Sequence, residues 1–184
     1  APTNQVLLQC DGDGDGLTSF NLDLAAEALT NGDQSLNLEF YTSQNDAETR
    51  SNRITNSSNF QNTAAGQTLY VRITNPHGCH SISTLTLHTS TNGLTAPTSI
   101  ALCDDSDGTD DGFTVFDLTQ SNSQILQNLP QGLQLEYFLT ANDALLAQNA
   151  IAAPESFTNS IAFNQTVYAR IYNGSECYGI TTLE

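Results

Sequence analysis

Two acidic loops contain the residues best suited to chemistry. The first reads CDGDGDGL at residues 10–17, where Asp11, Asp13 and Asp15 alternate with glycines. Because glycine permits a tight backbone, the three carboxylates can converge on one point, where their repulsion calls for a cation. Hard oxygen donors favour calcium over transition metals. The first loop is therefore predicted to bind calcium, with Asp23 or nearby side-chain oxygens completing the ligand sphere.

The second loop, CDDSDGTDDGF at residues 103–113, is longer than the first. Counting back from Gly112 makes Asp111 and Asp107 the expected counterparts of Asp15 and Asp11. Further candidate calcium ligands in or beside this loop are Asp104, Asp105, Asp110 and Asp117. The alternative is that both loops are solvated acidic turns that hold no metal.

The two loops recur because the whole chain is a tandem repeat. LNLEFY at 36–41 matches LQLEYF at 133–138, and QTLYVRI at 67–73 matches QTVYARI at 165–171. The tripeptide NDA also occurs once in each copy. A period of this length indicates an array of small domains. We predict two modules, 1–91 and 92–184, with a polar linker at about 89–99, and we expect the native protein to carry further modules.

The four cysteines fall two to a module. Cys10 and Cys79 lie in the first module, and Cys103 and Cys177 lie in the second. Even numbers of cysteines in small domains are typical of disulfides in an oxidising, extracellular setting. We predict one bridge inside each module, Cys10–Cys79 and Cys103–Cys177. The alternative is four buried free thiols.

The hydrophobic pattern is that of short strands. In QTLYVRI, Leu69, Val71 and Ile73 alternate with Tyr70 and Arg72, which predicts a half-buried antiparallel strand with Arg72 toward solvent or in a salt bridge. Arg170 is expected to behave in the same way. We therefore predict an all-β fold of two tandem immunoglobulin-like β-sandwich modules. Jelly rolls and small barrels give similar patterns.

Helical signals are confined to short segments. Residues 22–32 and 118–132 each suit a helical turn that ends at a glycine, Gly32 or Gly132. Another short turn is expected within residues 45–54 and within residues 142–151, with Asn45 or Asp46 as the cap in the first copy.

Charge excludes several classes of partner. All four basic residues are arginines, against 20 acids, for a formal net charge of -16. Such a field repels phosphate backbones, so we expect no nucleic-acid partner. The sequence contains no signal peptide and no apolar run of spanning length, and we expect no membrane insertion. A secreted, extracellular protein agrees best with this composition.

Catalytic residues are not expected, and neither is a cofactor-binding site apart from calcium. All three histidines lie in the first module, so the copies share no histidine-based machinery. His77, Cys79 and His80 have only a superficial likeness to a zinc site. Glu39 and Glu136 recur at one strand position, where a salt bridge or an exposed edge is expected rather than an acid–base pair. We predict that the protein is not an enzyme.

The order of these motifs resembles a known family. A cysteine and acidic loop, then FNLDL or FDLT, a LEFY or LEYF strand, NDA, the QT strand and a late cysteine resemble modules of giant Bacteroidetes cell-surface proteins. Those proteins are similar to gliding-motility-associated adhesins exported by type IX secretion. The resemblance implies a structural or adhesive segment of a secreted cell-surface or filament protein. Neighbouring repeats of the same chain are the implied partners, with cell-surface glycans or self-association into filaments as further candidates.

A second function remains open, namely a carbohydrate-binding β-sandwich module of a secreted multidomain protein. Sugar-binding faces generally need exposed aromatic side chains. The chain has no Trp, and the tyrosines expected to reach solvent are Tyr41, Tyr70, Tyr168, Tyr172 and Tyr178.

Overall fold

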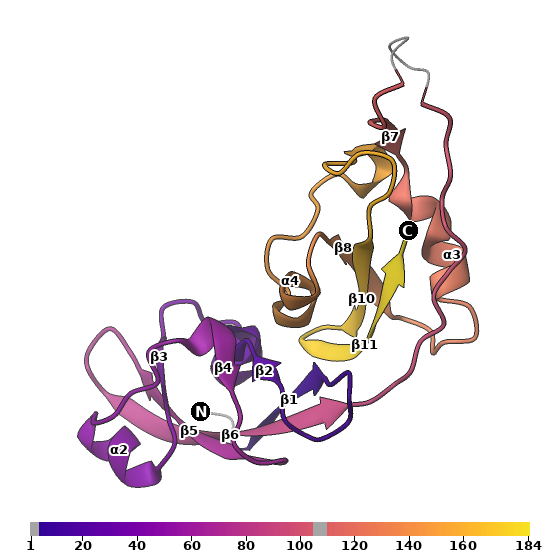
Figure 1. Cartoon of the computed structure of the whole chain (residues 1–184). Coiled ribbons are helices and arrows are strands. Elements are labelled where there is room, and N and C mark those ends of the chain that lie inside the picture. Colours follow the sequence, from indigo (N-terminus) through magenta and orange to yellow (C-terminus); the bar gives the residue numbers. More distant parts are fainter. Residues whose placement is uncertain (1–3, 105–109) are drawn as a thin grey trace. The chain divides into compact units, whose positions relative to one another are not determined.

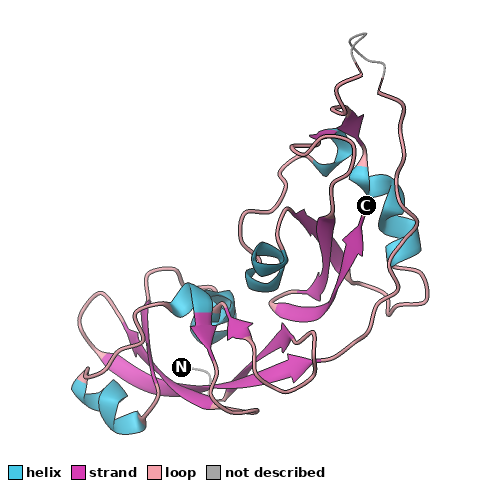
Figure 2. Cartoon of the chain, viewed as in Figure 1, coloured by secondary structure: helices cyan, strands magenta, loops and turns pink. Residues whose placement is uncertain are grey.

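The chain forms two compact units, with the main division between Thr91 and Asn92. The structure, a computed structural model, describes residues 4–104 and 110–184 (Figure 1). Figure 2 shows that strands dominate both units and that the helices are short. The all-β prediction, with two tandem sandwich modules and a few helical turns, is confirmed.

The first module is built on one four-stranded sheet with the strand order β1-β6-β5-β3. β1 and β6 pair in parallel, so that Cys10 lies opposite Ser90, whereas β5 is antiparallel to both of its neighbours. The strands of the sheet are β1 (Gln5–Cys10), β3 (Asn37–Tyr41), β5 (Thr68–Thr74) and β6 (His80–Ser90). The remaining elements are β2 (Ser19–Phe20), η1 (Leu22–Ala25), α1 (Ala26–Thr30), α2 (Gln44–Thr49), η2 (Ser57–Asn59) and β4 (Phe60–Gln61), where η denotes a 3-10 helix and β2 pairs with β4.

The core of the first module lies between this sheet and the segment that contains β2, η1 and α1. Apolar side chains from one face of the sheet pack against Phe20, Leu22 and Leu29, which are fully buried. The alternation of strand side chains predicted this face, because successive residues point to opposite sides. The sheet contributes Leu7, Phe40, Leu69, Val71, Ile73, Leu85 and Leu87.

The second module repeats most of this plan. Its sheet has three strands in the order β11-β10-β8, and β7 pairs with β9 in a short ribbon. Its core contains Leu118, Tyr137, Val167, Ala169 and Leu183. The elements are β7 (Val115–Phe116), η3 (Leu118–Ser121), α3 (Asn122–Ile125), β8 (Gln134–Phe138), α4 (Ala141–Leu146), η4 (Pro154–Ser156), β9 (Phe157–Thr158), β10 (Val167–Asn173) and β11 (Glu176–Leu183).

The repeated NDA tripeptide forms the start of a capped helix. In the first module Ser43 is the N-cap of α2, and its side chain accepts the Asp46 N–H at 3.1 Å and donates to the Asp46 carboxylate at 2.6 Å. Thr140 and Asp143 make the same exchange at α4. The bond to the aspartate N–H is that of an N-cap, and the second bond joins the hydroxyl to the aspartate carboxylate. The sequence placed the cap two or three residues too late, on Asn45 or Asp46, because it did not distinguish the cap from the residue whose N–H the cap accepts.

Arg72 and Arg170 are not exposed to solvent as the strand pattern predicted. Arg72 and Arg170 are both buried, at 9% and 2% exposed. Arg72 Nη1 donates to the carbonyl of Ala47 at 2.9 Å, at the carboxyl end of α2. Arg170 lies over the ring of Tyr172, 5.4 Å from its centroid. Because α2 covers the strand face that the alternation assigned to solvent, the period of two alone could not predict this burial.

Candidate functional site

The three aspartates of the first acidic loop come together as predicted. One carboxylate oxygen from each of Asp11, Asp13 and Asp15 lies within 4.8 Å of the others. Asp11 is buried at the end of β1, and the other two are exposed. Their oxygen donors suit calcium, since carboxylates are its preferred protein ligands.

Asp11 also has a structural role inside its own loop. Its two carboxylate oxygens accept the backbone N–H groups of Gly14 at 3.1 Å and Gly16 at 2.8 Å. Burial opposes ionisation, but the hydrogen bonds from Gly16, Gly14 and Asp13 outweigh it and hold the pKa of Asp11 below its ordinary value. Each oxygen keeps a lone pair for a further ligand. The loop therefore fits a cation, with Asp11 fixed and Asp13 and Asp15 facing solvent.

Gly16 is required where it stands. Its φ of 83° lies in the left-handed region, and a Cβ there would come within 2.8 Å of the Ala65 side chain. The carbonyl of Gly16 accepts the side-chain amide of Asn62 at 2.8 Å, and Asn62 Oδ1 accepts the N–H of Thr18 at 2.8 Å. Asn62 is buried and closes the loop from the opposite segment.

The second module uses the same device. Asn159 Nδ2 donates to the Gly112 carbonyl at 2.7 Å, and its Oδ1 accepts the Thr114 N–H at 2.8 Å. Sequence reasoning missed both asparagines. The repeat could have indicated them, because each asparagine lies two residues after a matched phenylalanine, in FQN and FTN.

Asp104, rather than Asp107, takes the place of Asp11 in the second loop. The Gly112 N–H donates to the Asp104 carboxylate, as Gly16 donates to Asp11. Counting back from Gly112 gave the wrong residue because the additional residues of the second loop lie between Asp104 and Gly112 in the sequence. The counterpart of Asp11 is instead the residue that directly follows the cysteine. Asp105 and Asp107 lie outside the described residues. Asp111 is confirmed as the counterpart of Asp15, since each accepts the N–H two residues later.

The other predicted ligands lie outside the Asp11 cluster. Asp117 is the N-cap of η3 and accepts the Thr119 N–H at 2.9 Å, and Asn21 caps η1 in the same way. Asp23 lies exposed within η1, and Asp110 is exposed. Within residues 4–104 and 110–184, the cluster of Asp11, Asp13 and Asp15 is the one group of three such side chains close enough to share a metal. Helix capping accounts for Asp117 without a metal.

The cysteine pairs differ from the prediction. Cys10 and Cys177 are disulfide-bonded, whereas Cys79 and Cys103 are exposed free thiols. The predictions of a Cys10–Cys79 bridge and a Cys103–Cys177 bridge are therefore both wrong.

Strand length explains why a bridge inside the first module cannot form. Cys10 is paired with Ser90 at one end of β6, and Cys79 precedes His80 at the other end. At about 3.3 Å per residue, the 11 residues from Ser90 back to Cys79 separate the two cysteines by roughly 35 Å. A disulfide needs Cα atoms within about 7 Å. In the second module the Ile100 N–H bonds the Glu184 carbonyl, which places Cys103 beyond one end of β11, while Cys177 lies near the other.

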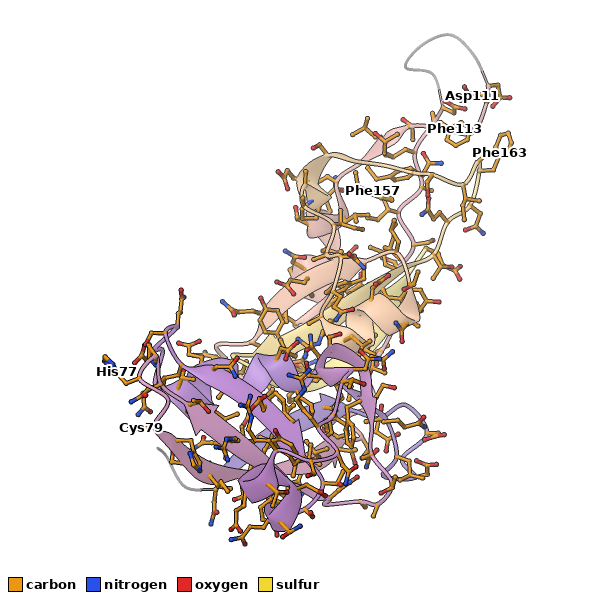
Figure 3. All side chains as sticks on the ribbon, turned by 90° about the vertical axis from the view of Figure 1, so that its left-hand side faces the viewer. His77, Cys79, Asp111, Phe113, Phe157 and Phe163 are labelled. Atoms are coloured by element: carbon orange, nitrogen blue, oxygen red, sulfur yellow. The ribbon has the colours of Figure 1, made fainter. Side chains whose placement is uncertain are left out.

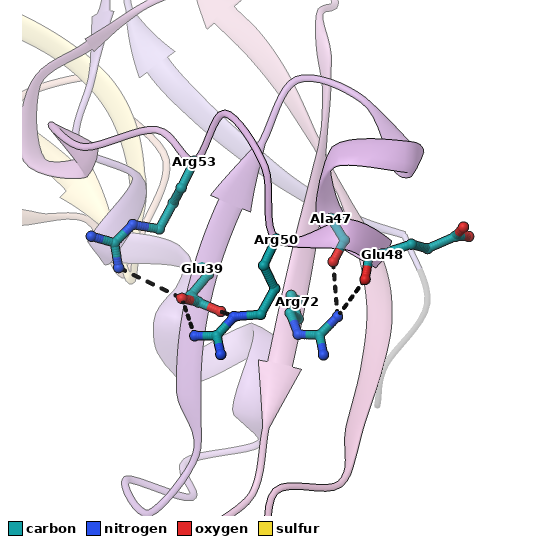
Figure 4. Close-up of polar contacts among 6 residues, drawn as sticks. All are labelled: Glu39, Ala47, Glu48, Arg50, Arg53 and Arg72. Carbon is teal, nitrogen blue, oxygen red and sulfur yellow. Dashed lines mark hydrogen bonds and ion pairs between the residues drawn. The ribbon is translucent and has the colours of Figure 1, made fainter.

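A second polar cluster surrounds Glu39 on β3 (Figure 4). Its buried carboxylate accepts two hydrogen bonds from Arg50, at 2.7 and 3.1 Å, and lies 3.6 Å from Arg53. The bond from Arg50 is the largest cause that holds the pKa of Glu39 below its ordinary value. The predicted salt bridge is confirmed for Glu39. Glu136 instead accepts the Tyr172 hydroxyl at 3.1 Å.

The turn between β5 and β6 holds His77 and Cys79 at the surface (Figure 3). The Asn75 side chain accepts the N–H groups of both residues at 3.0 Å. Cys79 is a free thiol rather than the oxidised cysteine that the sequence suggested.

The fold and the bonded cysteines together define the class: a segment of a multidomain extracellular protein, built from tandem all-β modules with a disulfide. The chain belongs to the Flavobacterium inter-domain disulphide bond domain family, whose model matches residues 6–93 and 99–184. Cys10 falls in the first matched region and Cys177 in the second. No curated protein matches the chain. In the described part of the chain, no helix has the length and apolar character to cross a membrane.

Proposed function

We propose that this chain is a load-bearing spacer segment of a secreted cell-surface adhesin or filament, without enzymatic activity and exported by type IX secretion. The observation that carries the proposal is the Cys10–Cys177 disulfide, which joins two residues near opposite ends of a tandem repeat. The order of the motifs, which resembles that of modules in giant Bacteroidetes cell-surface proteins, supports the assignment.

The disulfide changes how the chain carries tension. The covalent loop encloses residues 11–176, so a force applied at the two ends passes through the sulfur–sulfur bond and loads only the segments outside the loop, which include most of β1 and β11. The residues inside the loop are then protected from forced extension regardless of the stability of their modules. This property suits an adhesin segment that lies between a cell and a surface.

Single-molecule pulling from the two ends tests the proposal. Under oxidising conditions only the 16 residues 1–9 and 178–184 lie outside the loop, so the chain should lengthen by at most about 60 Å. The double variant Cys10→Ser/Cys177→Ser should unfold and lengthen by several hundred ångströms. The matched double variant Cys79→Ser/Cys103→Ser removes only the free thiols and should behave like the parent chain. Full extension of the oxidised parent chain would remove the basis for a load-bearing role.

Calcium forms part of the proposal. Asp11, Asp13 and Asp15 present converging oxygens on a loop that the Asn62 bonds hold closed. A structural ion there would cancel the repulsion between the carboxylates and stiffen the end of β1, next to the bonded Cys10.

Neighbouring modules are the proposed partners. Cys79 matches Cys177, and Cys103 matches Cys10, at equivalent places in the repeat. The two exposed thiols are therefore the positions at which modules on either side would form the same type of bond. Glycans and self-association of filaments remain candidate contacts of the assembled protein.

The tyrosines favour the spacer over a carbohydrate-binding module. Tyr41 is fully buried, although the sequence suggested exposure. Tyr70, Tyr168, Tyr172 and Tyr178 are half-buried. None of the six tyrosines offers the exposed ring that a sugar-binding face generally needs.

A further inference from the structure

The second module exposes four large apolar side chains on two segments beside its acidic loop. Phe113 and Val115 lie just before and at the start of β7, and they are 41% and 55% exposed. Ile161 and Phe163 lie in the loop after β9, and they are 59% and 76% exposed. We call these four residues the apolar patch. Single exposed apolar residues are ordinary on a protein surface, whereas a group of them marks an interaction site.

Hydrogen bonds hold the two segments side by side. The Phe163 N–H donates to the Gly112 carbonyl at 3.0 Å. The Asn159 side-chain amide donates to the carbonyls of Gly112 and Ile161, at 2.7 and 2.8 Å. The Phe163 ring also lies against Gly112, since a Cβ at that glycine would come within 2.8 Å of it. Figure 3 shows Phe113 and Phe163 at the same end of the module, so the patch residues are exposed there as one group.

The first module has smaller side chains at the matching positions. The counterparts of the four patch residues, in the same order, are Leu17, Ser19, Ala64 and Ala65. Ala65 lies against Gly16 as Phe163 lies against Gly112. Leu17, Ala64 and Ala65 are exposed, although β6 of the first module continues as far as Ser90. Exposure is therefore a property of these positions in the fold, whereas the bulky apolar side chains are particular to the second module. Because exposed groups bury little area, folding does not account for them.

The charge of the second module determines which partner the patch attracts. Asp110 and Asp111 are exposed in the adjoining loop, and Asp111 accepts the Phe113 N–H at 3.1 Å. Arg170 is the sole basic residue in 92–184, and it is 2% exposed. The field at the patch is therefore negative, so it attracts cations and repels phosphate groups and anionic membranes.

A second copy of this chain is a poor occupant for the patch. Each copy has a formal net charge of -16, so two copies repel one another. Arg72 and Arg170 are buried, while Arg50 and Arg53 already pair with Glu39. None of the four arginines, all of which the structure describes, is therefore left to face the aspartates beside the patch.

We infer that the apolar patch binds a short segment of a different protein, in which apolar side chains are flanked by Lys or Arg. The apolar side chains of this segment cover the patch, and its cations pair with Asp110 and Asp111. A sugar would stack only on the two phenylalanines, whereas a peptide also covers Val115 and Ile161. The patch offers on the order of a few hundred Å², less than the roughly 800 Å² per partner of a stable interface, so the contact is weak and reversible.

Selection of phage-displayed random heptapeptides on the full chain, with its two free thiols blocked, tests the inference without assuming a sequence. Enriched peptides should combine apolar residues with at least one Lys or Arg, and NMR titration should give dissociation constants of about 10 to 100 µM. A patch variant has the first module's residues, Phe113→Leu, Val115→Ser, Ile161→Ala and Phe163→Ala, and it should weaken binding at least about tenfold. The variant should fold, because the first module folds with these residues.

Two further variants separate the contributions of position and charge. Leu17→Ser removes an exposed apolar side chain at the matching position of the first module, and it should leave binding unchanged. Asp110→Asn/Asp111→Asn keeps the shape of both side chains and should weaken binding by about threefold to tenfold, with loss of the preference for Lys and Arg.

Several results would overturn the inference. They are the absence of enriched peptides, enriched peptides without basic residues, and binding that the patch variant retains. Dimers of the parent chain that the patch variant abolishes would assign the patch to a second copy, and glycan binding lost in that variant would assign it to carbohydrate. The patch variant retains Cys10 and Cys177, so none of these results bears on the role of the disulfide under tension.

Discussion

Asp11 shows how one residue can serve structure and binding together. Its carboxylate organises the loop by accepting two glycine N–H groups, and it also stands within reach of Asp13 and Asp15. Replacing Asp11 would therefore disturb the loop whether or not calcium binds. Asp13 is the better test position, because its side chain is exposed and its loss affects the cluster more than the backbone.

Calcium is expected to raise the melting temperature of the first module, and Asp13→Asn is expected to abolish the rise. For dissociation constants of about 0.1 to 1 mM, millimolar calcium contributes about 0.4 to 1.4 kcal/mol to the free energy of unfolding. Calorimetry with calcium and with chelator measures the difference. Asp33→Asn removes the same charge from a turn outside the cluster and should leave the calcium effect intact. Identical melting with and without calcium in the parent chain would show that the loop is a solvated turn.

At the scale of elements, the two short helices after β3 and β8 depend on their caps. Both have only six residues, which is too short to be stable alone in water. Both begin with a reciprocal hydroxyl–aspartate exchange and end in a left-handed residue, Arg50 or Ala147. Their position matters because α2 ends against Arg72 and supplies the Arg50 that pairs with Glu39.

Ser43→Ala is expected to lower the free energy of unfolding of the first module by about 1 kcal/mol, because an N-cap side chain satisfies a helix N–H that otherwise has no partner. Ser43→Thr should retain most of the stability, since Thr140 performs the same role in the second module. Urea denaturation gives both values. A loss below about 0.3 kcal/mol for the alanine variant would contradict the capping role.

The strand pattern in the sequence predicted some features of these elements and missed others. The alternation of apolar residues predicted the strands and the core face correctly, because side-chain direction in a strand is local. It failed for Arg72 and Arg170, because the sequence pattern does not tell which helix covers the other face.

At the scale of the whole molecule, the disulfide is the feature that links the two modules covalently. The bonded cysteines are the early one of the first module and the late one of the second. The remaining two have the same positions in the repeat and are exposed. If the rule is general along the array, each module is linked to the next one by the same pair.

Oxidation of the purified chain is therefore expected to join copies through Cys103 of one and Cys79 of the next. An equal mixture of Cys79→Ser and Cys103→Ser chains leaves one free thiol on each, and it should give heterodimers well above the half expected for random pairing. Non-reducing electrophoresis of the mixture, with one chain tagged, counts the products. Random or homodimeric pairing would contradict a head-to-tail rule.

The sequence by itself determined the repeat, the all-β class, the converging aspartates of the first loop and the short helices, because each depends on residues close together in the chain or on matched spacing. Only the tertiary structure decided the cysteine pairs, the place of Asp104 and the burial of Arg72. Those depend on which strand ends meet and which surfaces are covered. Cys10 lies opposite the last residue of β6, whereas Cys79 precedes its first residue. The spacing of the two cysteines along the sequence does not predict this distance in space.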